Sequence, residues 1–147
     1  MPSQSIIGTS LLVFRENSRG QLEVFVRFAP EELRPNYCLP YRELSPGSDA
    51  LDCALNIGKN SLQMNIPTRD ISYEKSVLVH NTGDTAEKVR VFIVESRPGS
   101  PFEAIAERDH FRGWKYAFVP ARVLDPVWVY PRIDVTTETV QFMILGC

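Results

Sequence analysis

The pattern of apolar and polar residues near the start of the chain predicts a β-hairpin. Residues Ile6 to Phe14 form a β-rich run, and between Leu22 and Phe28 apolar residues occupy every second position. The segment Asn17-Ser18-Arg19-Gly20 between them consists mostly of residues that favour turns. Two strands joined by a short turn that contains glycine are typical of an antiparallel β-hairpin, so we expect the two runs to pair.

The next part of the chain predicts a loop followed by a helix. Three prolines make the segment 29–41 a loop, with at most a short extended piece at Tyr37-Cys38-Leu39. After a turn at Ser45-Pro46-Gly47-Ser48, apolar residues recur at the three- and four-residue spacing of one helical face, up to about Met64. Ser48 or Asp49 is available as the N-cap of this helix. The face consists of Ala50, Leu51, Ala54, Leu55, Gly58 and Leu62.

The second half of the chain returns to strands. Tyr73 to His80 and Lys88 to Glu95 are β-rich, and the latter is apolar on both faces, as in a strand that is covered on both sides. Pro98 to Pro101 is expected to be a loop and Trp114 to Val119 a short strand, whereas the pattern of 134–145 fits either a helix or a strand. We expect one α+β domain over 1–147, with a mixed sheet covered on each side by a helix.

Composition, charge and cysteine spacing argue against several classes of protein. With 44% hydrophobic and 23% charged residues, and no apolar run long enough to cross a bilayer, we expect a cytoplasmic protein without a membrane partner. The N-terminal residues also lack the basic region of a targeting signal. A net charge of −2 argues against nonspecific binding to nucleic acid. The cysteines Cys38, Cys53 and Cys147 show no metal-ligand spacing, so we expect reduced thiols and no zinc site.

Several short pieces, in this order, resemble a Nudix domain. They are the opening strand at Ile7 to Phe14, Leu39-Pro40, the Pro46-Gly47 turn before the helix, and Tyr116 to Pro120. The segment 109–114, Asp-His-Phe-Arg-Gly-Trp, is similar to a piece of the diadenosine polyphosphate hydrolase branch of that family. The resemblance implies an α/β/α sandwich with a mixed sheet between helices.

The chemistry of that family depends on the signature G-x5-E-x7-R-E-U-x-E-E-x-G-U, in which U is a bulky apolar residue. Its glutamates lie one helical turn apart and hold Mg²⁺ beside a pyrophosphate. The local pieces place the signature at residues 42–64, with Gln63 at the last glycine. No acidic residue lies between Asp52 and Asp70, so another register does not restore the ligands. The glutamate positions are occupied by Ser48, Ile57, Asn60 and Ser61.

Three functions remain open. The leading hypothesis is a catalytically inactive Nudix-like domain without a cofactor, used as a binding or structural module with a protein or ribonucleoprotein partner. The second is a nucleotide-binding protein or sensor that does not cleave its ligand. The third is a divergent nucleoside or dinucleoside polyphosphate hydrolase, which would use Mg²⁺ through relocated carboxylates such as Glu43, Glu74 or Glu107. The candidate nucleotide-binding residues are Arg27, Tyr41, Arg42, Lys59 and His110.

Each of these features also has a plain structural explanation. Asn56, Lys59, Asn60 and Gln63 can form a solvated helix face, and the residues around His110 can form an exposed polar loop. The apolar segment Val127-Trp128-Val129-Tyr130 belongs either to the core or to a docking patch.

Overall fold

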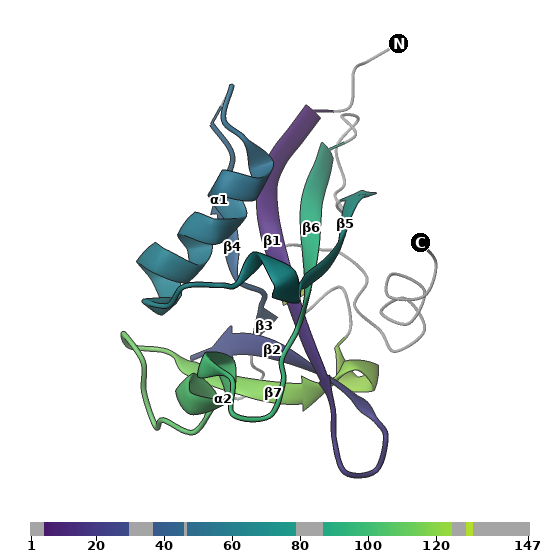
Figure 1. Ribbon diagram of the computed structural model, residues 1–147, viewed down its shortest axis with the longest axis vertical. Coiled ribbons are helices and arrows are strands. Elements are labelled where there is room, and N and C mark those ends of the chain that lie inside the picture. Colours follow the sequence, from purple (N-terminus) through teal and green to yellow (C-terminus); the bar gives the residue numbers. More distant parts are fainter. Residues whose placement is uncertain (1–4, 30–36, 46, 79–86, 125–128, 131–147) are drawn as a thin grey trace.

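The computed structural model describes residues 5–29, 37–45, 47–78, 87–124 and 129–130. Its centre is one mixed sheet with the strand order β5-β6-β1-β2-β3-β8, to which β4 is attached through β1 and β7 through β2 (Figure 1). The strands are β1 Ser5–Glu16, β2 Leu22–Phe28, β3 Tyr37–Cys38, β4 Tyr41–Glu43, β5 Ile71–Leu78, β6 Glu87–Glu95, β7 Lys115–Pro120 and β8 Val129–Tyr130. The helices are α1 Ala50–Asn56, the π-helical η1 Ile57–Leu62, the 3₁₀ turns η2 Thr68–Asp70 and η3 Ala121–Val123, and α2 Pro101–Ala106.

The predicted hairpin is confirmed. β1 and β2 are antiparallel, with Phe14 opposite Val24, and Asn17 closes the turn. The side-chain oxygen of Asn17 accepts hydrogen bonds from the backbone N–H groups of Arg19 and Gln21, at 2.8 and 3.0 Å. Gly20 adopts a φ of 74°, a backbone conformation that glycine tolerates without steric cost. Local turn chemistry therefore determines this part of the fold.

The strand order places β1 and β6 in the interior of the sheet. β1 runs parallel to β6 from Ser5 opposite Glu87 to Phe14 opposite Glu95, and β5 pairs antiparallel with the other edge of β6. The prediction of a strand covered on both sides is confirmed, because successive β6 residues belong to two different core clusters. Val89, Val91 and Ile93 belong to one cluster, and Phe92 and Val94 to the other.

Both described α-helices cover the same face of the sheet. Ala54 of α1 and Phe102 of α2 belong to one core cluster with Phe25 of β2, and η1 adds Ile57 and Leu62 (Figure 1). The α+β class with a mixed sheet is thus confirmed. The segment 134–145, which was a candidate for the helix on the opposite face, lies outside the described residues, as does the apolar pair Val127-Trp128.

The helix α2 follows directly on the predicted loop 98–101 and was not expected from the sequence. Ser100 is its N-cap and accepts a hydrogen bond from the N–H of Glu103, while Pro101 occupies the first helical position. A serine followed three residues later by glutamate is a known helix-start pattern, and proline favours the first turn. The signal was therefore present, but the helix is only six residues long and gives little apolar periodicity.

The predicted helix at 50–64 is confirmed to Leu62, although its second half is π-helical. Asp49 is at the N-cap position, but its side chain makes no capping hydrogen bond. Gly58 permits close packing, because a Cβ atom at this position would lie 2.9 Å from the Ile66 side chain. The helix ends at Gln63, whose φ of 54° and ψ of 43° are left-handed.

Candidate functional site

The helix α1–η1 covers most of the segment that the sequence resemblance aligns with the Nudix signature. Gln63 has a left-handed backbone conformation, which glycine favours at the end of a helix. The resemblance aligns Gln63 with the last glycine of the signature, and the conformation agrees with that alignment. Asn56, Lys59, Asn60 and Gln63 are all exposed, which fits a solvated helix face. Ile57 has an exposed fraction of 0% and lies in the core cluster beneath the helix. In the register that the resemblance implies, Ile57 stands at a glutamate position, and its side chain belongs to the hydrophobic core.

The carboxylates nearest the first turn of α1 surround a small pocket. It has a volume of about 290 Å³ and is lined by Arg42 and Glu43 of β4 and by Asp49 and Asp52, among others. The buried thiol of Cys53 closes its base, with Sγ 4.0 Å from the Arg42 carbonyl oxygen and 3.9 Å from that of Glu43. In the described part of the chain, no group of three or more His, Cys, Asp or Glu side chains could hold a metal ion.

These residues do not fit the Mg²⁺ site that the fold family implies. A magnesium ion requires charged oxygen ligands in a near-octahedral arrangement. Ile57 offers an apolar side chain, and Asn60 and Ser61 offer neutral oxygens. No step of a metal-dependent hydrolysis can therefore be assigned to the helix.

A second group of chemically distinctive side chains lies on the same face of the sheet, at the C-terminal end of the helix. The guanidinium of Arg27 on β2 lies 4.5 Å from the ring centroid of Trp114, which is a cation–π contact. The Nε atom of Arg27 is buried and has no hydrogen-bond partner. The guanidinium carries a positive charge on a side chain that is only half-buried, so it is suited to pair with an anion.

The loop that carries Trp114 is held against the helix end. Phe111 and Trp114 exchange backbone hydrogen bonds of 2.8 and 3.1 Å around Arg112 and Gly113. Both central residues have positive φ, 54° for Arg112 and 84° for Gly113, as in the tight turns of hairpins. Nη1 of Arg112 donates to the carbonyl oxygen of Asn60 at 2.6 Å. This hydrogen bond joins the loop to the end of η1.

The five candidate nucleotide-binding residues fall into separate regions. Arg27 contacts Trp114, whereas Lys59 and His110 are only the chain neighbours of Asn60 and Phe111, two residues that the Trp114 loop contacts. Lys59 and His110 are both exposed. Arg42 instead lines the pocket at the other end of the helix. Tyr41 packs against the core cluster on the opposite face of the sheet, where its ring fills the space beside Gly8.

Two residues of this region, Trp114 and Arg112, were not among the candidates. Their sequence signal was a two-residue turn ending in glycine between two aromatic residues. We name the group formed by Arg27, Arg112 and Trp114, with Lys59 and His110 as its neighbours along the chain, the cation–aromatic cluster. It combines positive charge with an aromatic face, which together can bind phosphate and a planar base.

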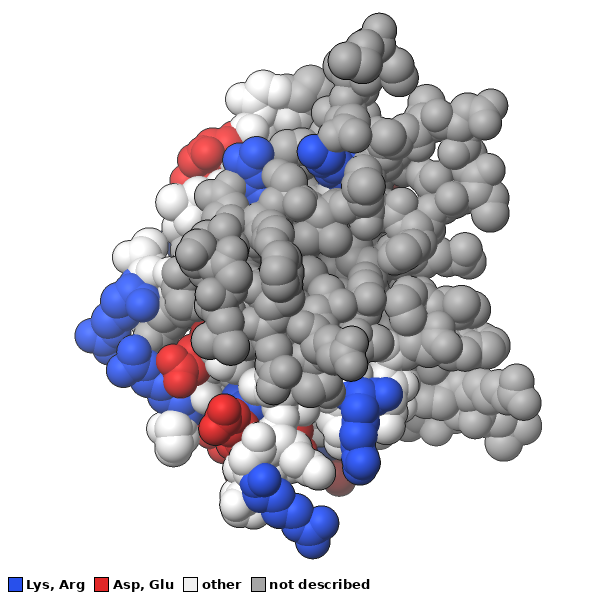
Figure 2. Space-filling view, turned by 90° about the vertical axis from the view of Figure 1, so that its right-hand side faces the viewer, with Lys and Arg blue, Asp and Glu red and all other residues white. Residues whose placement is uncertain are grey.

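Other parts of the surface carry mixed charge. Figure 2 shows the face at the right of Figure 1, on which the described Lys and Arg side chains are interspersed with Asp and Glu. No helix within the described ranges is both long and apolar enough to span a lipid bilayer.

Solved structures provide the fold-level comparison, since no protein-family model and no curated protein matches the sequence. A Nudix hydrolase of M. smegmatis, RenU, is similar with a TM-score of 0.54 and 14% identity, over 99% of this chain and 93% of that one. A mutT/nudix family protein from Listeria innocua has a TM-score of 0.50 and 9% identity, over 96% and 90%. The NUDIX domain of Shewanella oneidensis NrtR, complexed with ADP ribose, has a TM-score of 0.50 and 9% identity, over 97% and 86%. The chain therefore has the Nudix fold.

Proposed function

We propose that this domain binds a nucleotide-type ligand without hydrolysing it. The absence of hydrolysis is supported by the burial of Ile57 in the core, at a position where the sequence resemblance places a glutamate of the Nudix signature. A hydrolase with the usual metal site needs a carboxylate there that faces the ligand, and this backbone directs the side chain into apolar surroundings. The exposed neutral residues Asn56 and Asn60 on the same helix do not replace that charge.

The cation–aromatic cluster supports a phosphorylated, base-containing ligand. Arg27 is half-buried and its guanidinium lies over the Trp114 ring, so the cluster offers a charged donor for phosphate beside an aromatic face. Lys59 is exposed and directly precedes Asn60, whose carbonyl oxygen Arg112 binds, and Trp114 is half-buried with a ring suited to stacking. The neighbour from Shewanella oneidensis was crystallised with ADP ribose, so that ligand is a reasonable first probe for this chain.

A domain that binds a ligand without changing it can affect other molecules only through a partner that it contacts. We therefore retain the sequence-based hypothesis of a protein or ribonucleoprotein partner. Its test is co-purification of the full chain under mild salt, followed by size-exclusion chromatography. Elution as a free monomer would contradict a stable assembly.

The experiment for the proposed function combines turnover with thermal stability. The protein is incubated with ADP-ribose, ATP or diadenosine tetraphosphate, with Mg²⁺ or Mn²⁺, while products and melting temperature are followed. We expect a rise in melting temperature without turnover, because a ligand of the native state stabilises it by mass action. Turnover that is lost in Glu43→Gln or Glu107→Gln would refute the non-hydrolytic proposal.

The location of the site is tested with a matched pair of arginine variants. Arg27→Gln should weaken binding by about 10–100-fold, since it removes a charged donor to phosphate. Arg19→Gln removes the same charge from the exposed hairpin turn and should leave affinity unchanged. No melting shift with any ligand, or equal losses in both variants, would reject nucleotide binding at the cluster.

A further inference from the structure

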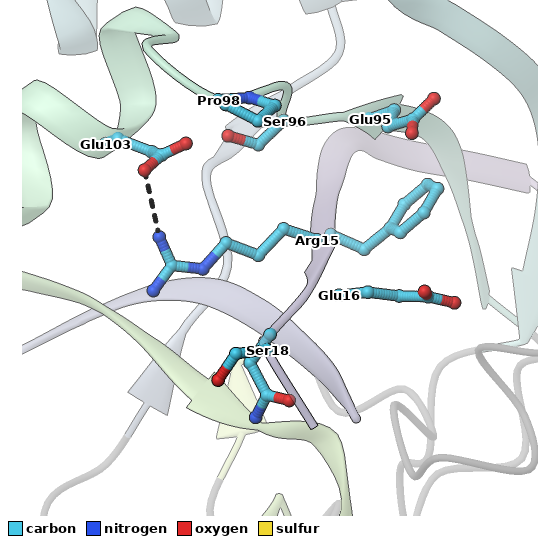
Figure 3. Close-up of a pocket in the computed structure, with 9 residues that line it drawn as sticks. Arg15, Glu16, Ser18, Glu95, Ser96, Pro98 and Glu103 are labelled. Carbon is cyan, nitrogen blue, oxygen red and sulfur yellow. Dashed lines mark hydrogen bonds and ion pairs between the residues drawn. The ribbon is translucent and has the colours of Figure 1, made fainter. Parts of the chain in front are cut away.

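The loop that joins α2 to β7 leaves a helix that is held at both ends. Glu103 in the first turn of α2 pairs with Arg15 of β1, whose Nη1 lies 3.3 Å from a carboxylate oxygen of Glu103 (Figure 3). At the other end of α2, Nζ of Lys115 donates to the carbonyl oxygens of Ala106 and Arg108, at 2.9 and 2.8 Å. A lysine at this end of a helix satisfies carbonyl groups that have no partner within the helix. The loop therefore starts from a fixed point.

The tip of this loop is attached to the end of the other helix (Figure 1). Nη1 of Arg112 donates to the carbonyl oxygen of Asn60 at 2.6 Å, and the two residues are 52 positions apart in the sequence. Asn60 lies in the last turn of η1, where carbonyl oxygens lack a partner within the helix and the helix dipole favours a positive charge. Arg112 therefore caps the carbonyl end of η1, as Lys115 caps that of α2.

The cap holds a turn whose backbone is strained. Arg112 has a φ of 54°, a left-handed conformation that is unfavourable for a residue other than glycine. On one side of it Phe111 has an exposed fraction of 7%, and its ring packs edge-on against that of Tyr116 at 5.8 Å. On the other side the half-buried Trp114 ring lies 4.5 Å from the Arg27 guanidinium. A relaxation of the turn therefore moves Trp114 more than Phe111, because the core holds Phe111.

We propose that Arg112 is a positioning residue of the nucleotide site and acts through Trp114. Its hydrogen bond to Asn60 holds the turn in the left-handed conformation, and the turn fixes the ring on which a base stacks. The phosphate of the ligand pairs with the Arg27 guanidinium beside that ring. Base binding through Trp114 rests on the proposed function, whereas the position of the ring is a property of the protein alone.

The position of the Trp114 ring is tested first without a ligand. The chain has two tryptophans, Trp114 and Trp128, so protein labelled with fluorotryptophan gives two ¹⁹F NMR signals, which Trp114→Phe assigns. We expect Arg112→Ala to shift or broaden the Trp114 signal, because alanine keeps a side chain in the strained conformation but removes the donor to Asn60. The matched control Arg122→Ala removes an exposed arginine from η3 and should leave that signal unchanged. An unchanged Trp114 signal in Arg112→Ala would overturn the proposal.

The route by which Arg112 acts is tested by calorimetric titration of the full chain with ATP and with inorganic tripolyphosphate, without a metal ion. Both ligands carry a chain of phosphates, and only ATP carries a base. We expect Trp114→Ala and Arg112→Ala each to weaken ATP binding by about tenfold and to leave tripolyphosphate binding unchanged, because each disturbs the stacking of one base. Arg122→Ala should bind both ligands as the parent protein does.

A double variant separates positioning from direct contact with phosphate, for which the Arg112 guanidinium has further N–H groups. Arg112→Ala combined with Trp114→Ala should bind ATP as weakly as Trp114→Ala alone, since Arg112 acts through the ring. Additive losses, or an equal loss of ATP and tripolyphosphate binding in Arg112→Ala, would show direct contact and overturn the positioning role. If neither ligand binds the parent protein, the proposed nucleotide site is wrong, and the ¹⁹F signals alone decide whether Arg112 fixes the ring.

Discussion

Restoring a glutamate at residue 57 tests the reasoning on the missing metal site. Ile57 has an exposed fraction of 0% and packs in the core cluster that includes Leu11 and Phe25 of the sheet. The substitution Ile57→Glu therefore places a carboxylate among apolar side chains, with no described cation in that cluster to pair with it. We expect the variant to fail to fold rather than to gain a metal ligand.

The expected loss in the free energy of unfolding of Ile57→Glu is the sum of two contributions. Losing the packing of a buried isoleucine costs about 2–5 kcal/mol, and burying an unpaired ionisable group adds several kcal/mol more. Domains of this size have total stabilities of about 5–15 kcal/mol. The sum is therefore comparable with the whole stability of the protein.

Urea denaturation followed by circular dichroism measures these effects. Ile57→Val should lower the free energy of unfolding by about 0.5–1.5 kcal/mol, since it removes one buried methylene. Asn60→Glu restores a signature glutamate at an exposed position and should change stability by no more than about 0.5 kcal/mol. If Ile57→Glu remained folded with a melting temperature near that of the parent, position 57 would not be committed to the core. The argument against a metal site would then be wrong.

Three further predictions concern backbone positions. Gln63→Gly should stabilise the protein by about 0.5–1 kcal/mol, because Gln63 is exposed and holds a φ of 54° that favours glycine. Arg112→Gly relieves the same strain but loses the 2.6 Å hydrogen bond to Asn60, so denaturation should show a smaller gain or a loss. Gly58→Ala should cost about 1–3 kcal/mol through contact with Ile66, and Ile66→Val should then cost less than it does in the parent. Additive costs at these two positions would argue against the close approach.

Local features of the fold were readable from the sequence wherever a short segment determined its own structure. The hairpin around Asn17 and Gly20 depends on turn residues that act over a few positions. The two-sided burial of β6 was visible as an unbroken apolar run. The helix α2 was missed because its apolar residues are too few to show a period, although Ser100 and Glu103 marked its start.

The candidate site was only partly predictable, because its members come from distant parts of the chain. The sequence by itself determined that no acidic residue lies between Asp52 and Asp70, so that most of this helix lacks carboxylates. Only the tertiary structure showed that Ile57 belongs to the core, that Arg27 lies over Trp114, and that Tyr41 packs on the other face of the sheet. The physical reason is that strand pairing and helix packing decide which faces meet, and these contacts join residues far apart in sequence.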